Sequence, residues 1–328
     1  MERIWISWNV RGLGRAEKRR AVKELLKKAQ PELVLLQDTK LDAQKEKLAL
    51  NFARSLNFEC EWVPAQGTAG GLLTLWKPAS FTLLQVSKGD RFLFTLFSVN
   101  QSSNCVVGNI YGPHLESSRI SFFTDLGLVF GQWNCSMVLG GDFNATLNAE
   151  DRSGRLGGTE ASFSNFVQDW NLIDLPLQNS DFTWYSERNG GVWSRIDRWL
   201  LNEEAWDSLG EVTQRAENWG LSDHRMVALS WGQQVTGPKP FLFYNNWLLD
   251  KEFDRMVKEW WSSTAVQGWS GYVLQQKFKE LKLKIKGWSG HSRTRGEENI
   301  KSLEEELQVI MERLELDGDS EELKIKRC

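Results

Sequence analysis

Short apolar runs that end in polar residues recur along residues 1–232 of the chain. Such runs between turn residues are typical of strands, whereas apolar positions at intervals of three and four residues indicate helices. The pattern predicts helices over residues 15–29, 42–55, 116–130 and 160–170. It predicts strands over residues 3–9, 32–37, 58–64, 72–77, 81–87, 92–99, 104–111, 137–141, 182–185, 193–201 and 225–231. We therefore expect an α/β (α+β) fold, a four-layer sandwich of two packed mixed β-sheets flanked by helices.

A different pattern follows residues 233–239, whose glycine and proline indicate a linker. Beyond it, over residues 240–328, apolar residues form two stripes at helical spacing, which predicts a helical C-terminal extension. The stripes are Leu274, Phe278, Leu281, Ile285 and Trp288, and then Ile300, Leu303, Leu307, Ile310 and Leu314. Each is about two heptads long, short of the roughly three to four of a coiled coil. We expect two helices that pack on each other or on a further domain, with a dimerising or partner-binding hairpin as the alternative.

Composition restricts the classes of protein that this chain can belong to. Hydrophobic residues make up 41% and charged residues 25% of the sequence, as in soluble globular proteins. The net charge of −3 means that any contact with nucleic acid must be local. We expect most of the 17 tryptophans to lie in the core or in packed surface.

The cysteines and the apolar runs indicate the cellular compartment in which the protein is located. The four cysteines show no paired spacing, which argues against a disulfide framework or a zinc site and for a reducing compartment. No apolar run approaches the ~20 residues of a membrane span, and the first residues carry charges where a signal peptide has its apolar core. We therefore expect a nuclear or cytoplasmic protein with no membrane partner.

The segment Gly140-Gly141-Asp142-Phe143-Asn144 holds the most informative polar residues, directly after the apolar run 137–139. We expect the two glycines to let the backbone turn and to keep bulk away from a ligand. Asp142 and Asn144 are two residues apart and share a side of an extended chain. Hydrolysis of a phosphoester needs a group that takes a proton from water and another that holds the water or a phosphate oxygen. An ordinary turn is the alternative, because Asp and Asn favour turns.

Other apolar strands also have polar residues at their ends. Asn9 and Arg11 follow the first strand, Asp38 follows the second, Asp197 precedes the apolar residues 199–201, and Asp223-His224 precedes the last strand. Each segment alone is most simply a turn at the end of a strand. Their joint order is much less expected by chance.

This order of motifs resembles the endonuclease/exonuclease/phosphatase family, which has a DNase I-like fold and includes apurinic/apyrimidinic endonucleases. The resemblance covers residues 1 to about 232. It implies a site that binds Mg²⁺, with Mn²⁺ as an alternative. The metal residues that it implies are Asp38, Asn9 and Asp223. The catalytic residues that it implies are Asp142, Asn144, His224, Asp197 and Tyr111.

Two positions depart from the family pattern. Asp38 stands where the family has Glu, so the carboxylate is one methylene shorter at a metal that demands near-octahedral geometry. His114 stands where nuclease members often have Asn, and we interpret it as an exposed imidazole in a loop.

Within the family, the chain is most similar to endonuclease domains of plant non-LTR retrotransposons of the LINE type. The segment from Trp8 to Gly14 and the segment Asp181-Phe182-Thr183-Trp184 carry this likeness. It implies DNA as partner, with a reverse transcriptase domain downstream in the full-length element. Thr183 matches a residue that such endonucleases place near target DNA. The other candidate DNA contacts are Arg11, Lys40 and Arg155.

The sequence thus leaves open three hypotheses about function. The first is an endonuclease that nicks DNA for reverse transcription. The second is a phosphatase that acts on a small phosphorylated molecule, because the same site serves both reactions. The third is a decayed retroelement fragment that folds but does not cleave, a hypothesis that the substitution at Asp38 favours.

Overall fold

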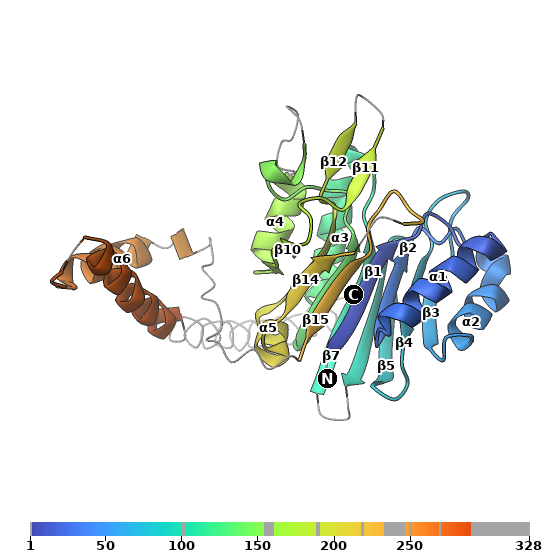
Figure 1. Cartoon of the computed structure of the whole chain (residues 1–328), viewed down its shortest axis with the longest axis horizontal. Helices are drawn as coiled ribbons and strands as arrows, with labels where there is room; N and C mark the ends of the chain where they lie inside the picture. The colour runs from blue at the N-terminus through green and yellow to red at the C-terminus, as the bar shows by residue number, and fades with distance from the viewer. Residues whose placement is uncertain are drawn as a thin grey trace, which may run out of the picture. The chain divides into compact units, whose positions relative to one another are not determined.

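The computed structural model describes residues 2–99, 103–153, 161–187, 191–217, 220–232, 247–248, 251–268 and 270–289 (Figure 1). The chain divides into two compact units, Met1–Lys239 and Pro240–Cys328. The predicted linker over 233–239 and the second apolar stripe lie outside the described residues.

Two mixed β-sheets form the centre of the first unit. The seven-stranded sheet has the order β10 (Leu177–Gln178), β14 (Thr213–Ala216), β15 (Val227–Trp231), β1 (Arg3–Asn9), β2 (Leu33–Gln37), β4 (Leu72–Trp76) and β3 (Glu59–Val63). The six-stranded sheet has the order β5 (Phe81–Lys88), β6 (Phe92–Val99), β7 (Ser103–Tyr111), β8 (Ser136–Asp142), β13 (Asp197–Leu201) and β9 (Ile173–Asp174). Both sheets contain parallel pairs, β1 with β2 and β7 with β8, among antiparallel ones.

The inner faces of the sheets meet through large aromatic side chains. The ring centroids of Trp5 in β1 and Trp199 in β13 are 6.2 Å apart, and those of Trp76 in β4 and Phe97 in β6 are 5.0 Å apart. All four side chains are buried. Burial of such large rings supplies much of the apolar area that stabilises a sandwich core.

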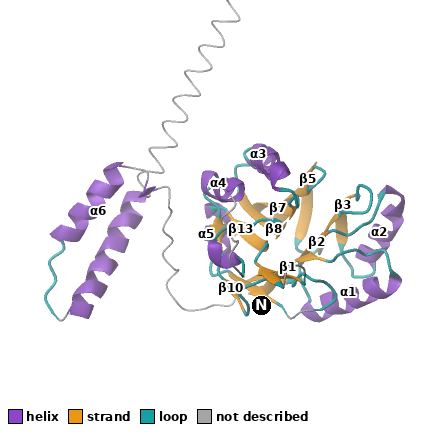
Figure 2. Cartoon of the chain, turned by 90° about the horizontal axis from the view of Figure 1, so that it is seen from above, coloured by secondary structure: helices purple, strands orange, loops and turns teal. Residues whose placement is uncertain are grey.

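Helices cover the outer faces of both sheets, as Figure 2 shows from above. Val22, Leu26 and Phe52 pack with residues of β1 and β2, and Phe123 and Phe163 pack with residues of β7 and β8. The helices are α1 (Ala16–Ala29) and α2 (Glu46–Arg54) on the first sheet, and α3 (Arg119–Phe130), α4 (Ala161–Asp169) and α5 (Glu203–Leu209) in the second half of the unit. The predicted four-layer sandwich is confirmed.

One predicted strand is interrupted in the structure. The pattern over 193–201 predicts a single strand, but the chain forms β12 (Val192–Ser194) and then β13. β12 pairs with β11 (Trp184–Ser186) in a separate hairpin and forms an isolated bridge from Ser194 to Arg152, whereas β13 joins the six-stranded sheet. The amide of Arg195 donates to the carbonyl of Asp151 instead of to a strand. The short elements β9, β10, β14 and α5 were not predicted, because each has too few residues to show a periodic pattern of apolar positions.

In the second unit, α6 (Lys251–Ser263) is followed by a helix over residues 270–289. Phe253 of α6 and Ile285 are buried, and the rings of Phe253 and Trp288 lie 4.5 Å apart. Leu274 and Phe278 of the same stripe stay exposed. Within the described residues, the first predicted stripe thus packs partly against α6. No described helix in the chain is both long enough and apolar enough to cross a membrane.

Candidate active site

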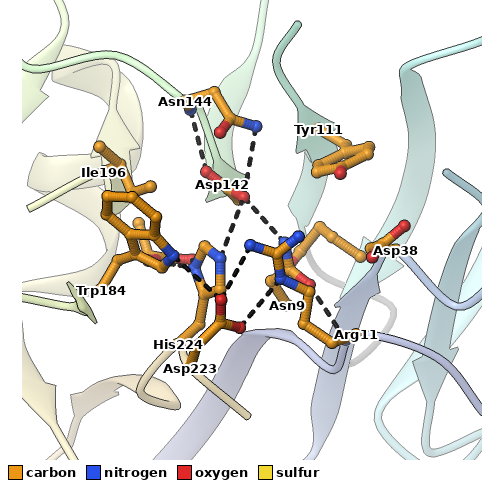
Figure 3. A network of polar contacts seen from close by, with 12 residues as sticks. Asn9, Arg11, Asp38, Tyr111, Asp142, Asn144, Trp184, Ile196, Asp223 and His224 are labelled. Carbon is orange, nitrogen blue, oxygen red and sulfur yellow. Dashed lines mark hydrogen bonds and ion pairs between the residues drawn. The ribbon is translucent and has the colours of Figure 1, made fainter. Parts of the chain in front are cut away.

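Strand pairing brings the polar strand ends together at one rim of the sandwich (Figure 3). Asn9 ends β1 beside Gln37 of the parallel strand β2. In the other sheet, Asp142 at the end of β8 pairs with Tyr111 of the parallel β7 and with Asp197 of the antiparallel β13. Parallel strands end at the same edge of a sheet, so the pairing explains why residues so distant in sequence meet here.

A buried chain of acid, imidazole and acid forms the centre of the site. Nδ1 of His224 lies 3.1 and 3.0 Å from the two carboxylate oxygens of Asp197. Nε2 of the same ring lies 3.8 Å from Oδ2 of Asp142. All three side chains are buried. The bond to Asp197 favours the tautomer with the proton on Nδ1, which leaves Nε2 directed at the Asp142 side.

The surroundings shift the proton affinity of both Asp142 and His224. Burial, followed by the charge of Asp197, raises the pKa of Asp142 to about 6, although His224 and Asn9 act in the opposite direction. Burial lowers the pKa of His224, but the charges of Asp197 and Asp142 outweigh it, so the pKa is raised overall. Asp142 therefore titrates close to neutrality, where a carboxylate is most useful as a base.

Two asparagines fix the carboxylate of Asp142. Nδ2 of Asn9 donates to Oδ2 of Asp142 at 2.8 Å, and the backbone N–H of Asn144 donates to Oδ1 at 2.9 Å. Asn144 has a φ of 51°, a left-handed conformation that Asn tolerates, and its Nδ2 donates to the carbonyl of Gly112 at 2.8 Å. The turn after β8 is therefore tied to the adjacent turn after β7.

The two glycines before Asp142 serve packing within a strand. Both lie inside β8, so the expected turn at this point is wrong. A Cβ on Gly141 would lie 2.0 Å from the carbonyl oxygen of Ile110, and one on Gly140 would lie 2.6 Å from the ring of Trp199. Only glycine allows the neighbouring strand and the opposing indole to come so close.

Asp38 is held apart from the Asp142 and His224 side chains. Its Oδ1 accepts a hydrogen bond from the amide of Gly70 at 2.9 Å, and its Oδ2 lies 3.5 Å from Nζ of Lys40. Figure 3 shows Asp38 on the far side of Asn9 from His224. Lys40, predicted to contact DNA, is thus the ion-pair partner of this carboxylate, with a side chain that is 42% exposed.

Asp223 is engaged by an arginine. Nε and Nη2 of Arg11 donate to its two carboxylate oxygens, each at 2.9 Å, and Nε1 of Trp184 donates to Oδ2 at 3.2 Å. Burial raises the pKa of Asp223, but the hydrogen bond and charge of Arg11, the charge of His224 and the bond from Trp184 together lower the pKa overall. Asp223, predicted as a metal residue, and Arg11, predicted as a DNA contact, are thus each other's partners in this structure.

The structure brings three of the predicted catalytic residues into one cluster, and Asp38 lies outside this cluster (Figure 3). Among the described residues, Asp142, Asp197 and His224 offer ligand atoms within 4.8 Å of one another, close enough to hold a metal ion. Asp38 and Asn9 offer oxygen atoms, the ligands that Mg²⁺ prefers. The ammonium group of an exposed lysine lies 3.5 Å from Oδ2 of Asp38, so a cation can take its place there.

Tyr111 lies at the rim with a partner that the sequence did not identify. Its hydroxyl lies 3.0 Å from Nε2 of His114, and the guanidinium of Arg91 lies 5.6 Å from its ring centre. Burial, followed by the charge of Asp38, raises the pKa of Tyr111. His114 is exposed, as expected, but its ring is bonded to a site residue. In the sequence, the only sign of this contact was that Tyr111 and His114 are three residues apart in a turn that contains a proline.

The other predicted DNA contacts divide into two cases. Thr183 is 0% exposed, so it does not face a DNA surface, and its prediction as a substrate contact is corrected on this ground. Arg155 lies outside the described residues.

A buried ion network behind Asp197 was also not predicted. Arg198 is fully buried and donates to the carboxylates of Asp151 and Asp174, and Arg195 donates to Asp174 at 2.8 Å. Asp151 also accepts from the backbone of the loop that follows Asn144. Buried charges persist only when they are paired in this way. The network thus fixes the start of β13 to the loop beyond Asp142.

Comparisons with known proteins identify a family whose match spans the residues of this site. A family model described as the endonuclease/exonuclease/phosphatase family matches residues 6–224. An uncharacterized 149 kDa protein of transposon TX1 from Xenopus laevis is 29% identical over 184 residues, which make up 53% of this chain and 13% of that protein. The chain therefore aligns with only a small part of that relative.

Solved structures share the fold. The 3'-5' exonuclease NExo from Neisseria meningitidis has a TM-score of 0.57 at 19% identity, with 70% of this chain and 99% of that chain covered. The endonuclease domain of TRAS1, a telomere-specific non-LTR retrotransposon, has a TM-score of 0.56 at 14% identity, with 71% and 100% covered.

The fold and the site define a hydrolase of phosphoester bonds built on a two-sheet sandwich. The family match spans well over half of the sequence, and the chain belongs to the endonuclease/exonuclease/phosphatase family. The resemblance seen in the sequence is thereby confirmed.

Proposed function

We propose that the chain is a metal-dependent endonuclease that nicks DNA for a non-LTR retrotransposon of the kind found in plants. The observation that carries the proposal is the buried set of Asp142, His224 and Asp197, with Asn9 and Asn144 fixing Asp142. A transposon protein among the relatives and a retrotransposon endonuclease among the structural neighbours support the choice of substrate.

The roles follow from position and proton affinity. Asp142, with its pKa raised to about 6, positions a water molecule and takes its proton. Asn144 holds that water or a non-bridging phosphate oxygen. His224, oriented by Asp197 and held in its charged form by a raised pKa, carries a second proton on Nε2 and donates it in a hydrogen bond to the phosphate as negative charge develops. Tyr111 offers a second donor from the opposite side of the rim.

Asp38 and Asn9 are the residues that we propose to hold Mg²⁺, or alternatively Mn²⁺. Such an ion supplies neutralisation of the phosphodiester charge and stabilisation of the leaving oxygen. Asp223 is left out of this set, because Arg11 and Trp184 already engage its oxygens.

Removal of divalent metal is expected to abolish activity. We expect the purified chain to nick supercoiled plasmid in the presence of Mg²⁺ and to stop when EDTA is added, because the proposed metal residues are carboxylate and amide oxygens. The measurement is conversion of supercoiled to open-circular plasmid on a gel, and restored Mg²⁺ should restore it. Nicking that continues undiminished in EDTA would exclude the metal mechanism.

The same preparation separates the alternative functions. Release of inorganic phosphate from small phosphate esters without nicking would favour the phosphatase hypothesis. A folded protein with neither activity would favour the decayed fragment.

Asp38→Glu is expected to raise nicking at limiting Mg²⁺. The longer side chain extends the carboxylate by one methylene, which is the length that the family pattern has at this position. The measurement is the Mg²⁺ concentration at half-maximal nicking. Asp38→Asn is the control, since it keeps the length of Asp but removes the charge, and it should weaken the response to Mg²⁺. An unchanged or weaker response of the Glu variant would mean that this site is shaped around Asp.

A further inference from the structure

Thr183 is a buried residue beside the site for which the proposed function has no role. Its Oγ1 accepts hydrogen bonds from the backbone N–H groups of Ile196 and Asp197, each at 3.1 Å. These residues mark the point at which β13 begins. The hydroxyl oxygen thus fixes the backbone that carries the carboxylate facing His224.

The main chain of Thr183 reaches the other member of the pair. Its carbonyl accepts a hydrogen bond of 2.7 Å from the backbone N–H of Arg225, the residue that follows His224 in the sequence. The next residue, Trp184, forms an isolated β-bridge with His224. One residue is therefore bonded through its side chain to the segment of Asp197 and through its backbone to the segment of His224.

We propose that Thr183 is a positioning residue whose hydroxyl sets Asp197 at hydrogen-bond distance from Nδ1 of His224. The inference rests on the proposed nuclease function, in which His224 contacts the phosphate. Thr183 itself is fully buried and touches no reacting atom. A small displacement of a catalytic group lowers the rate strongly, even when the mutation that causes it lies away from the reacting atoms. Loss of this hydroxyl should therefore lower kcat.

The test compares two substitutions at the same position. Thr183→Val keeps the branched shape and removes the acceptor, whereas Thr183→Ser keeps the hydroxyl. Thr95→Val is the matched control, because Thr95 is equally buried and its hydroxyl donates to the carbonyl of Val107 inside the six-stranded sheet. The readouts are hydrogen exchange at the amides of Ile196 and Asp197 by NMR, and kcat and KM for plasmid nicking.

We expect Thr183→Val to speed exchange at both amides about tenfold. We expect kcat to fall roughly tenfold with little change in KM, and Thr183→Ser to restore kcat to within about twofold. Thr95→Val should leave the exchange at both amides and kcat unchanged.

Several outcomes would overturn the proposal. They are a Val variant with the kcat of the original chain, and a fall in kcat without faster exchange at Asp197. If the Val variant does not fold, Thr183→Ala takes its place, since it leaves room for a water molecule. An Ala variant that also fails to fold would show that the hydroxyl serves stability only. The exchange experiment needs no activity, so a chain that does not nick would refute the proposed function while the position of Asp197 is still tested.

Discussion

Replacement of Asp142 by Asn is expected to lower plasmid nicking at neutral pH by at least ~10²-fold, the scale of losing a general base. That loss corresponds to roughly 2.7 kcal/mol of transition-state stabilisation. The side chain keeps its size, and Oδ1 can still accept from the amide of Asn144, so the short hydrogen bond that is lost is the bond from Nδ2 of Asn9, which the new amide nitrogen cannot accept. The fold should therefore survive, which thermal unfolding of both proteins checks. A variant that retains near-original nicking, in a preparation free of contaminating nuclease, would remove Asp142 from the mechanism.

The same residue is expected to determine the acid side of the pH profile. A base must be unprotonated to act, and burial and Asp197 raise the pKa of Asp142 to about 6. Nicking should therefore fall as pH drops through about 6, well above the value of 3.8 at which an ordinary Asp is protonated. The measurement is kcat against pH at saturating Mg²⁺. An acid limb near the ordinary value would show that burial does not perturb the base in the working enzyme.

His224→Ala is expected to have the second large effect, also at least ~10²-fold in kcat, because it removes the donor that meets charge developing on the phosphate. Asp197→Asn should have a smaller effect. The neutral amide binds Nδ1 of His224 less strongly than the charged carboxylate does, but the imidazole itself remains. The two residues act as one unit, so the double variant should be no slower than His224→Ala alone. Multiplicative losses in the double variant would show that Asp197 acts independently of His224.

Much of the site could be predicted from the sequence, because the relevant signals are local. Asp142, Asn144 and His224 flank apolar strands, and strand ends that lie at one edge of a sandwich converge. The apolar periods also predicted the two sheets, which agree with the structure to within a few residues for most long elements. The interruption before β13 could not be predicted, because the apolar pattern continues across it.

Contacts between distant segments lay beyond any local pattern. Arg11 and Asp223 are 212 positions apart, and only the folded chain shows that they form a bidentate pair. In the sequence, Arg11 was a candidate DNA contact, and the family resemblance implied a metal role for Asp223. An arginine and an aspartate that meet at hydrogen-bond distance satisfy each other, which changes what both are free to bind.

The sequence by itself indicated the order of the strands along the chain, the family, and the residues that we propose as base and hydrogen-bond donor. Apolar periodicity and the types of polar residue are written directly in the chain, and they need no tertiary contact to be recognised. The tertiary structure alone decided which groups are paired, how deeply Asp142 is buried, and that Thr183 is bonded to the backbone of Asp197. Burial, proton affinity and hydrogen-bond geometry depend on neighbours from other elements, and these neighbours exist only once the two sheets have packed.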